Sequence, residues 1–79
     1  MNNDEIARIL SGAGMLPWND EFGNVLVALD NKGAYISFDR DGTYYRAWMV
    51  YAGQSAGPFL VQPVELIQFV KIAREARAL

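Results

Sequence analysis

The segment Gly53-Gln54-Ser55-Ala56-Gly57 matches the pattern G-x-S-x-G, in which a serine nucleophile stands on a sharp turn between a strand and a helix. Such a serine needs a histidine base, and the chain has no histidine. Pro58 and Phe59 follow where the helix should begin, and 79 residues are too few for the large sheet that presents this motif. We therefore interpret residues 53–57 as a flexible connection.

The remaining chemistry-bearing residue types also fail to form a site. Gly12-Ala13-Gly14 lacks the third glycine of a dinucleotide-binding loop and is soon followed by Pro17, so it indicates a helix exit. The absence of cysteine and histidine excludes a thiolate nucleophile, a disulfide framework and a Cys/His metal site. Carboxylates alone can perform acid–base chemistry, but no two of them have a recognisable spacing. The sequence predicts no enzyme, no cofactor and no metal.

Composition predicts a single folded domain over residues 1–79. Hydrophobic residues make up 52% of the chain, which excludes intrinsic disorder. No apolar run approaches the ~20 residues of a membrane span, so we expect no membrane contact. Asp4 and Glu5 are acidic where a signal peptide would be basic. With the absence of cysteine, this favours a cytoplasmic protein.

Charge argues against binding to nucleic acid. The net charge is −2, and its distribution is uneven. Through Asp41 there are seven acids and three bases; after it there are two acids and four bases. Nucleic-acid binders usually carry a dense basic footprint, because neutralising phosphates supplies much of their affinity. An acidic mimic of nucleic acid stays open, but it would require the early acids to share one surface.

Three β-strands are expected in succession, with the sequences VLVAL, AYISF and TYYRAWMVYA. Two turns rich in Asp, Asn and Gly join them, at residues 30–33 and 39–42, and short joints of this kind are typical of β-hairpins. The strands should therefore pair with their sequence neighbours as an antiparallel meander.

The hairpin loops predict which side chains share a face of the sheet. We expect two-residue loops, Asn31-Lys32 in the first hairpin and Arg40-Asp41 or Asp41-Gly42 in the second. A three-residue second loop would turn the third strand over. Alternation along each strand then assigns to the core face Val25, Val27, Leu29, Ala34, Ile36, Phe38, Tyr45, Ala47, Met49 and Tyr51. The opposite face carries Asn24, Leu26, Ala28, Tyr35, Ser37, Tyr44, Arg46, Trp48 and Val50.

The opposite face is too aromatic for an ordinary solvated sheet surface. Contiguous exposed apolar area usually marks an interface, and Tyr, Trp and Arg dominate interface energetics. Two alternatives stay open: a loop or helix of the same chain covers the face, or the rings are there because they pair well across strands. The predicted partner-binding residues are Tyr35, Tyr44, Arg46 and Trp48 on the sheet with Ile67, Lys71 and Arg74 on the final helix.

Helices are expected at both ends of the chain. Asn3 or Asp4 can cap a first helix to about Ser11, and a second should run from Pro63 to about Arg77. Between the first helix and the sheet we expect an ordered loop over residues 15–23, with Trp18 and Phe22 either plugging one end of the core or, as the alternative, serving as interface anchors. Residues 59–61 form either a fourth edge strand or a lid.

The predicted fold class is α+β in the order α-β-β-β-α, a three-stranded antiparallel meander with two helices packed on one face. This arrangement is similar to the double-stranded RNA-binding domain, although Pro63-Val64-Glu65-Leu66 replaces the lysine cluster of that family. It also resembles the type III secretion chaperone-like fold, whose members hold proteins or dimerise. A short, mildly acidic domain without catalytic residues further resembles the small phage-encoded inhibitors, anti-CRISPR proteins included.

Three functions follow as hypotheses. The favoured one is a non-enzymatic protein-binding module, an inhibitor that docks on a larger protein complex. The alternative is a dimeric chaperone or adaptor, and the third is a nucleic-acid binder or acidic mimic. The expected partner is a protein, with a homodimer as a further option.

Overall fold

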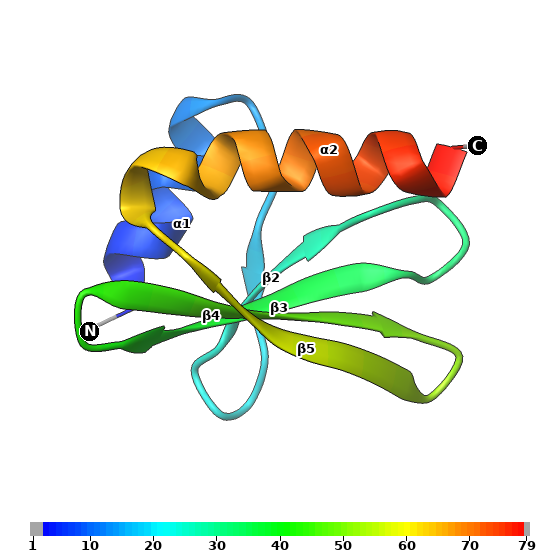
Figure 1. The fold of residues 1–79 in the computed structure, drawn as a ribbon, viewed down its shortest axis with the longest axis horizontal. Coiled ribbons are helices and arrows are strands. Elements are labelled where there is room, and N and C mark those ends of the chain that lie inside the picture. The colour runs from blue at the N-terminus through cyan, green and yellow to red at the C-terminus, as the bar shows by residue number, and fades with distance from the viewer. Residues whose placement is uncertain (1–2, 79) are drawn as a thin grey trace.

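The computed structural model describes residues 3–78, which form one five-stranded sheet with two α-helices on one side of it (Figure 1). The predicted α+β class and the antiparallel meander are confirmed, but the prediction of three strands is wrong. In chain order the elements are α1 (Asp4–Gly12), β1 (Trp18–Asn19), β2 (Val25–Ala28), β3 (Tyr35–Asp41), β4 (Tyr44–Tyr51), β5 (Gln54–Val61), the 3₁₀ turn η1 (Pro63–Glu65) and α2 (Leu66–Ala78).

The two additional strands lie at the two edges of the sheet, whose order is β1-β2-β3-β4-β5. β5 includes most of the segment that we expected to be a flexible connection. Its turn explains why: Ala52 and Gly53 both have positive φ, 54° and 78°, as in the two-residue turns whose twist matches that of the flanking strands. The chain therefore reverses tightly after β4 and pairs again.

The register of the two central hairpins decides which side chains enter the core. The first hairpin pairs Val25 with Phe38 and Val27 with Ile36, as predicted. In the second, Asp41 pairs with Tyr44 and Phe38 with Ala47, so the loop lies later than predicted. Because Phe38 still faces an odd-numbered residue, the side chains of β4 keep the faces that the sequence indicated.

The core lies between the inner face of the sheet and the two helices, which are on the same side (Figure 1). Each fully buried aliphatic or aromatic side chain contributes about 1.5–3 kcal/mol relative to exposure. The largest fully buried side chains are Ile6 and Leu10 of α1, Val25, Val27, Ile36, Phe38 and Tyr45 of the sheet, and Leu66 and Val70 of α2. Among residues 3–78, no charged side chain is buried.

Two aromatic residues that we expected in the core are not there. Trp18 is 45% exposed and Phe22 is 80% exposed. Trp18 lies in β1 opposite Leu26, which places its ring on the outer face of the sheet rather than at the end of the core. The two helices and the inner face already fill the core without either ring.

Gly57 stands at the point where the pairing of β4 and β5 is irregular, between Ala47 and Met49 of β4. Its φ is +134°, and a Cβ there would lie 2.7 Å from the Ala47 carbonyl oxygen. A side chain at this position therefore meets backbone that cannot move without loosening β5.

Replacing Gly57 by alanine should lower the free energy of unfolding by about 1–3 kcal/mol, the cost of a strained backbone conformation. Chemical unfolding measures the change. Gly12→Ala is the matched control, because a Cβ there meets nothing within 4 Å and alanine is the better helix former by up to about 1 kcal/mol. Equal free energies of unfolding for Gly57→Ala and Gly12→Ala would contradict the claim that a side chain at position 57 strains the backbone.

Tyr45 carries a polar atom into the core. Its side chain is fully buried, and its hydroxyl makes no hydrogen bond of good geometry, although the Glu5 carboxylate lies beside it. Burial, and then the nearby Glu5 carboxylate, raise the pKa of this phenol above its ordinary value of 10.0, so the group stays neutral. An unpaired buried hydroxyl costs about 1–3 kcal/mol.

Tyr45→Phe should therefore leave the protein as stable as before or raise its free energy of unfolding by about 1 kcal/mol. Tyr44→Phe, at a side chain that is 41% exposed, should change little. Thermal unfolding of both variants tests this. A clear fall in the free energy of unfolding of Tyr45→Phe would contradict this and would show that the Tyr45 hydroxyl makes a stabilising hydrogen bond.

Candidate protein-binding surface

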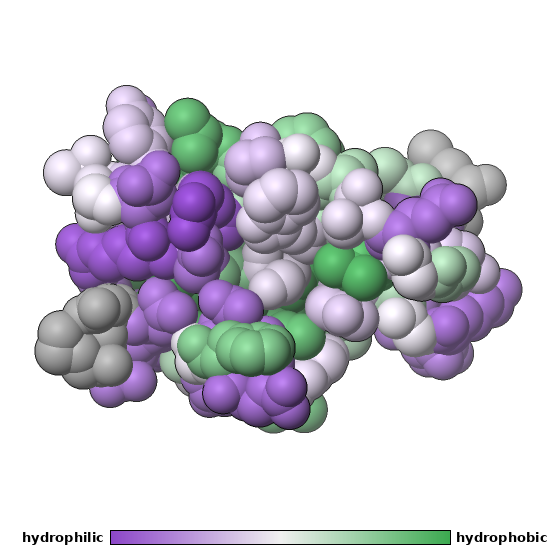
Figure 2. All heavy atoms as spheres, turned by 90° about the horizontal axis from the view of Figure 1, so that it is seen from below, coloured by the Kyte–Doolittle hydropathy of each residue, from purple (hydrophilic) through white to green (hydrophobic). Residues whose placement is uncertain are grey.

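The outer face of the sheet carries the aromatic residues that the sequence singled out. We call it the outer surface. Strand pairing aligns its side chains in two rows across the sheet, Trp18-Leu26-Ser37-Trp48 and Ala28-Tyr35-Val50, with Tyr44 and Arg46 toward the β3–β4 turn. Both helices lie on the other side of the sheet (Figure 1). Figure 2 shows this face with a pale and green centre between hydrophilic purple flanks.

The outer surface is partly ordered by contacts among its own rings. Trp18 and Tyr35 meet edge to face, with ring centroids 6.3 Å apart. Trp18 remains 45% exposed, and Tyr35 and Trp48 are half-buried. Of the alternatives left open by the sequence, pairing of rings across strands does occur here. The rings nevertheless stay open to solvent, because β1 extends the sheet at its edge and does not fold over it.

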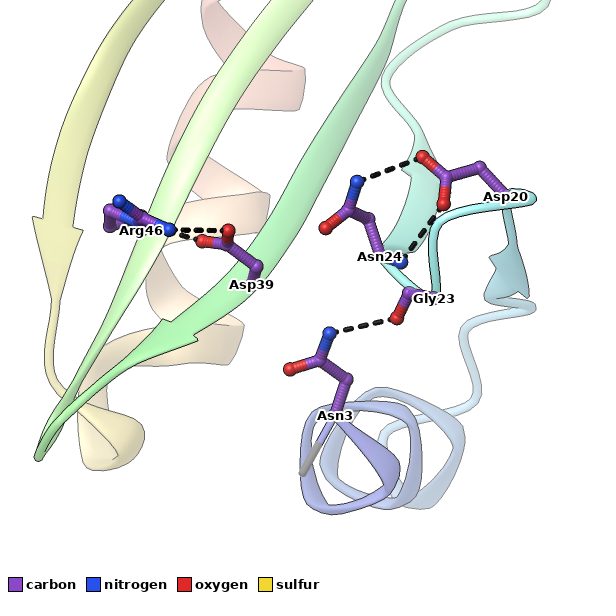
Figure 3. Close-up of polar contacts among 6 residues, drawn as sticks. All are labelled: Asn3, Asp20, Gly23, Asn24, Asp39 and Arg46. Carbon is purple, nitrogen blue, oxygen red and sulfur yellow. Dashed lines mark hydrogen bonds and ion pairs between the residues drawn. The ribbon is translucent and has the colours of Figure 1, made fainter. Parts of the chain in front are cut away.

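A bidentate ion pair borders the outer surface. The Arg46 guanidinium donates from Nε and Nη2 to the two carboxylate oxygens of Asp39, at 2.9 and 2.7 Å (Figure 3). The hydrogen bond to Asp39, reinforced by its charge, raises the pKa of Arg46. The pair holds the guanidinium in a fixed orientation beside the rings, so a partner meets a neutral, ordered rim rather than a free charge.

A hydrogen-bonded loop lies between β1 and β2. Asp20 accepts from the backbone N–H and the side-chain amide of Asn24 (Figure 3). It also accepts from the backbone N–H of Phe22. These bonds, led by that from the Asn24 side chain, lower the pKa of Asp20. Asn3 or Asp4 was expected to cap α1. Asn3 occupies the cap position but makes no side-chain capping bond; its amide instead donates to the Gly23 carbonyl at 2.8 Å and ties the loop to α1.

An open polar hollow of about 690 Å³ lies between this loop, the start of α1 and the β3–β4 turn. Asp4, Asn24, Asp39 and Arg40 are among its lining residues. Arg40 is already paired with Glu5 at 2.7 Å. Within residues 3–78 no three His, Cys, Asp or Glu side chains come close enough together to hold a metal ion.

The predicted partner-binding residues divide between two sides of the molecule. Tyr35, Tyr44, Arg46 and Trp48 belong to the outer surface, whereas Ile67, Lys71 and Arg74 lie on α2, across the sheet. Ile67 packs against the core, and Arg74 donates to the Ala28 carbonyl at 2.9 Å. Lys71 is exposed. One flat partner surface cannot contact both groups.

Sequence analysis did not place Trp18 in a strand. Of β5 it offered only residues 59–61, as an edge strand or a lid; the edge strand is confirmed, and residues 54–58 were missed. A strand of two residues shows no periodicity, so nothing in the sequence marked Trp18 as a sheet residue. The start of β5 could also have been found, because Ala52-Gly53 is a turn signal that precedes the apolar run of residues 59–61.

The C-terminal part of α2 is anchored to the turn between β2 and β3. Arg77 donates to Asp30 at 2.9 Å and lies 4.3 Å from the Tyr51 ring centroid. Asp30 also accepts from the backbone N–H groups of Lys32 and Ala34. The bond from Lys32, followed by that from Arg77, lowers the pKa of Asp30 below its ordinary value of 3.8.

No protein-family model, curated protein or solved structure matches this chain. Its surfaces are therefore interpreted from their own geometry. No helix within residues 3–78 combines the length and the apolar character needed to cross a bilayer.

The anchor of α2 predicts a pH dependence. A carboxyl whose pKa is lowered by folding stabilises the protein above its unfolded pKa, and this contribution is lost as the pH falls through the folded pKa. Asp30→Asn keeps an acceptor for the turn but has no charge for Arg77. It should be less stable than the wild type at neutral pH, and the difference should shrink below about pH 3.8.

Urea unfolding between about pH 6 and about pH 2 measures this difference. Arg77→Gln should behave as an intermediate case, because it removes one cause of the lowered pKa and leaves the bonds from Lys32 and Ala34. A difference between wild type and Asp30→Asn that does not change with pH would contradict the assignment.

Proposed function

We propose that this chain is a non-enzymatic, cytoplasmic protein-binding module that docks its outer surface on a larger protein, as small phage-encoded inhibitors of the anti-CRISPR type do. The observation that carries the proposal is the presence of Trp18, Tyr35 and Trp48 on one sheet face that no helix covers within residues 3–78. Exposed apolar area of this kind usually marks an interaction site.

Side chains of the outer surface are already held in place before a partner binds, which favours binding. Binding costs free energy when flexible side chains are immobilised. Here Trp18 and Tyr35 already restrain each other, and Asp39 already orients Arg46. A partner therefore buries aromatic surface while losing less side-chain entropy. Tyr, Trp and Arg side chains held in well-packed positions are typical of interface hot spots.

The distribution of charge gives an acidic nucleic-acid mimic no support. Asp30 lies at the opposite end of β3 from Asp41, so the early acids do not form one row. Asp30 and Asp39 are each paired with an arginine. The favoured partner is therefore a protein, with nucleic acid and membrane set aside.

A dimeric chaperone or adaptor of the secretion-chaperone kind is the second candidate. It is favoured by β5, an exposed edge strand of eight residues. The two candidates use different surfaces of the chain and can be tested separately.

A site-specific photo-crosslinker tests the favoured function and the surface together. It is placed at Ser37, in the middle of the outer surface, or at Lys71, on the opposite side of the molecule. A partner that cross-links from position 37 is then purified and titrated against wild type and the double variant Tyr35→Ser/Trp48→Ser. Loss of two central rings should weaken binding at least tenfold, since hot-spot residues cost more than about 1.4 kcal/mol each.

Tyr51→Ser is the control, because Tyr51 is as exposed as Trp18, at 45%, but lies outside the outer surface. It should bind like the wild type. Cross-linking from position 71 alone, or full affinity in a folded double variant, would refute docking through the outer surface.

A further inference from the structure

β5 is a sheet edge that nothing else in residues 3–78 covers. Every residue from Gln54 to Leu60 is exposed, and only Val61 is buried. Exposed side chains of β5 lie on both sides of the sheet. Neither α2 on the inner side nor the side chains of the outer surface therefore cover the strand. The opposite edge differs, because β1 has only two residues. The sheet thus has one short edge and one long one.

The long edge also lacks charge. Between Arg46 and Glu65 the sequence contains no charged residue. Natural proteins blunt exposed edges with lysine or other charges, with proline, or with irregular pairing. β5 contains Pro58, beside the irregular pairing at Gly57, and Pro58 removes one backbone donor. Backbone groups alternate in direction along a paired strand, so the other residues of β5 whose N–H and C=O groups point away from β4 stay available for another strand.

Apolar side chains continue on both sides of this edge. On the inner side Phe59 is 38% exposed and contacts Phe69 of α2, with ring centroids 6.0 Å apart. Ile72, one turn along α2 from Phe69, is 55% exposed. On the outer side Leu60, opposite Arg46, is 63% exposed. A strand added at β5 would therefore bury apolar surface above and below its backbone hydrogen bonds.

A second copy of this chain fits such an edge. Two copies of β5 that meet about a two-fold axis pair antiparallel, and an uncharged strand presents no like charges to itself. Ile72 and Phe59 of one copy would then be covered by the other. The chain has 79 residues and no cysteine, and at this size natural domains often gain stability from oligomerisation when disulfides and metals are lacking.

We propose that β5 pairs antiparallel with β5 of a second copy, so that two five-stranded sheets join into one continuous sheet in a homodimer. This contact is distinct from the outer surface, whose rings stay open in the dimer. It does not depend on the docking function proposed above: either contact can fail in experiment while the other holds.

Sedimentation equilibrium of the purified chain tests the pairing. The wild type should have twice the mass of one chain, and Ser55→Lys and Leu60→Lys should weaken the dimer at least tenfold by placing like charges at the joined edge. Ser11→Lys, the same substitution as Ser55→Lys but at an exposed position of α1, should remain dimeric. Circular dichroism verifies that the variants are folded.

Hydrogen exchange of the wild type supplies a second measurement that needs no variant. The β5 amides that point away from β4 should exchange more slowly as protein concentration rises. A wild type that is monomeric throughout, or a dimer that persists in both folded lysine variants, would overturn the proposal. A dimer that is lost in Tyr35→Ser/Trp48→Ser but kept in the lysine variants would also overturn it, and would place the contact on the outer surface.

Discussion

The central constraint on this protein is that its two helices cover only one side of a five-stranded sheet. The register of β3 and β4, with Phe38 opposite Ala47, sends the largest apolar side chains to the side where α1 and α2 pack. The same alternation sends Tyr35 and Trp48 to the other side. Residues 3–78 contain no further element that covers them, so an open, ring-rich face follows directly from how the core is built.

Electrostatic interactions position elements at the rim of this core and take no part in filling it. Arg40–Glu5 links the β3–β4 turn to α1, Arg46–Asp39 joins β4 to β3, and Arg77–Asp30 holds the C-terminal part of α2 against a turn. All six side chains retain solvent contact, where ion pairs stabilise weakly. Their main effect is to orient groups, and at Arg46 this orders the border of the outer surface.

Two unlike surfaces result, and they suit different kinds of contact. The outer surface offers preordered side chains, which can discriminate between partners by shape. β5 offers mainly backbone groups flanked by apolar side chains, which another strand can satisfy. Both proposals concern recognition. Because the two lie on different parts of the sheet, a dimer joined through β5 would present two outer surfaces.

Local patterns in the sequence determined the central hairpins, the faces of their side chains and the positions of both helices, because alternation and helical periodicity act over a few residues. The predicted faces are correct although the position of the second loop was wrong. The shift moved the partner of Phe38 by an even number of residues, which leaves each side chain of β4 on the same face. Tertiary structure decided most of the two edges, of which the sequence had offered only residues 59–61 as a candidate strand. β1 exists because two residues pair with β2, and Trp18 joins the outer surface through that pairing. β5 forms because β4 offers it a free edge, a contact between strands that the composition of residues 53–57 does not encode.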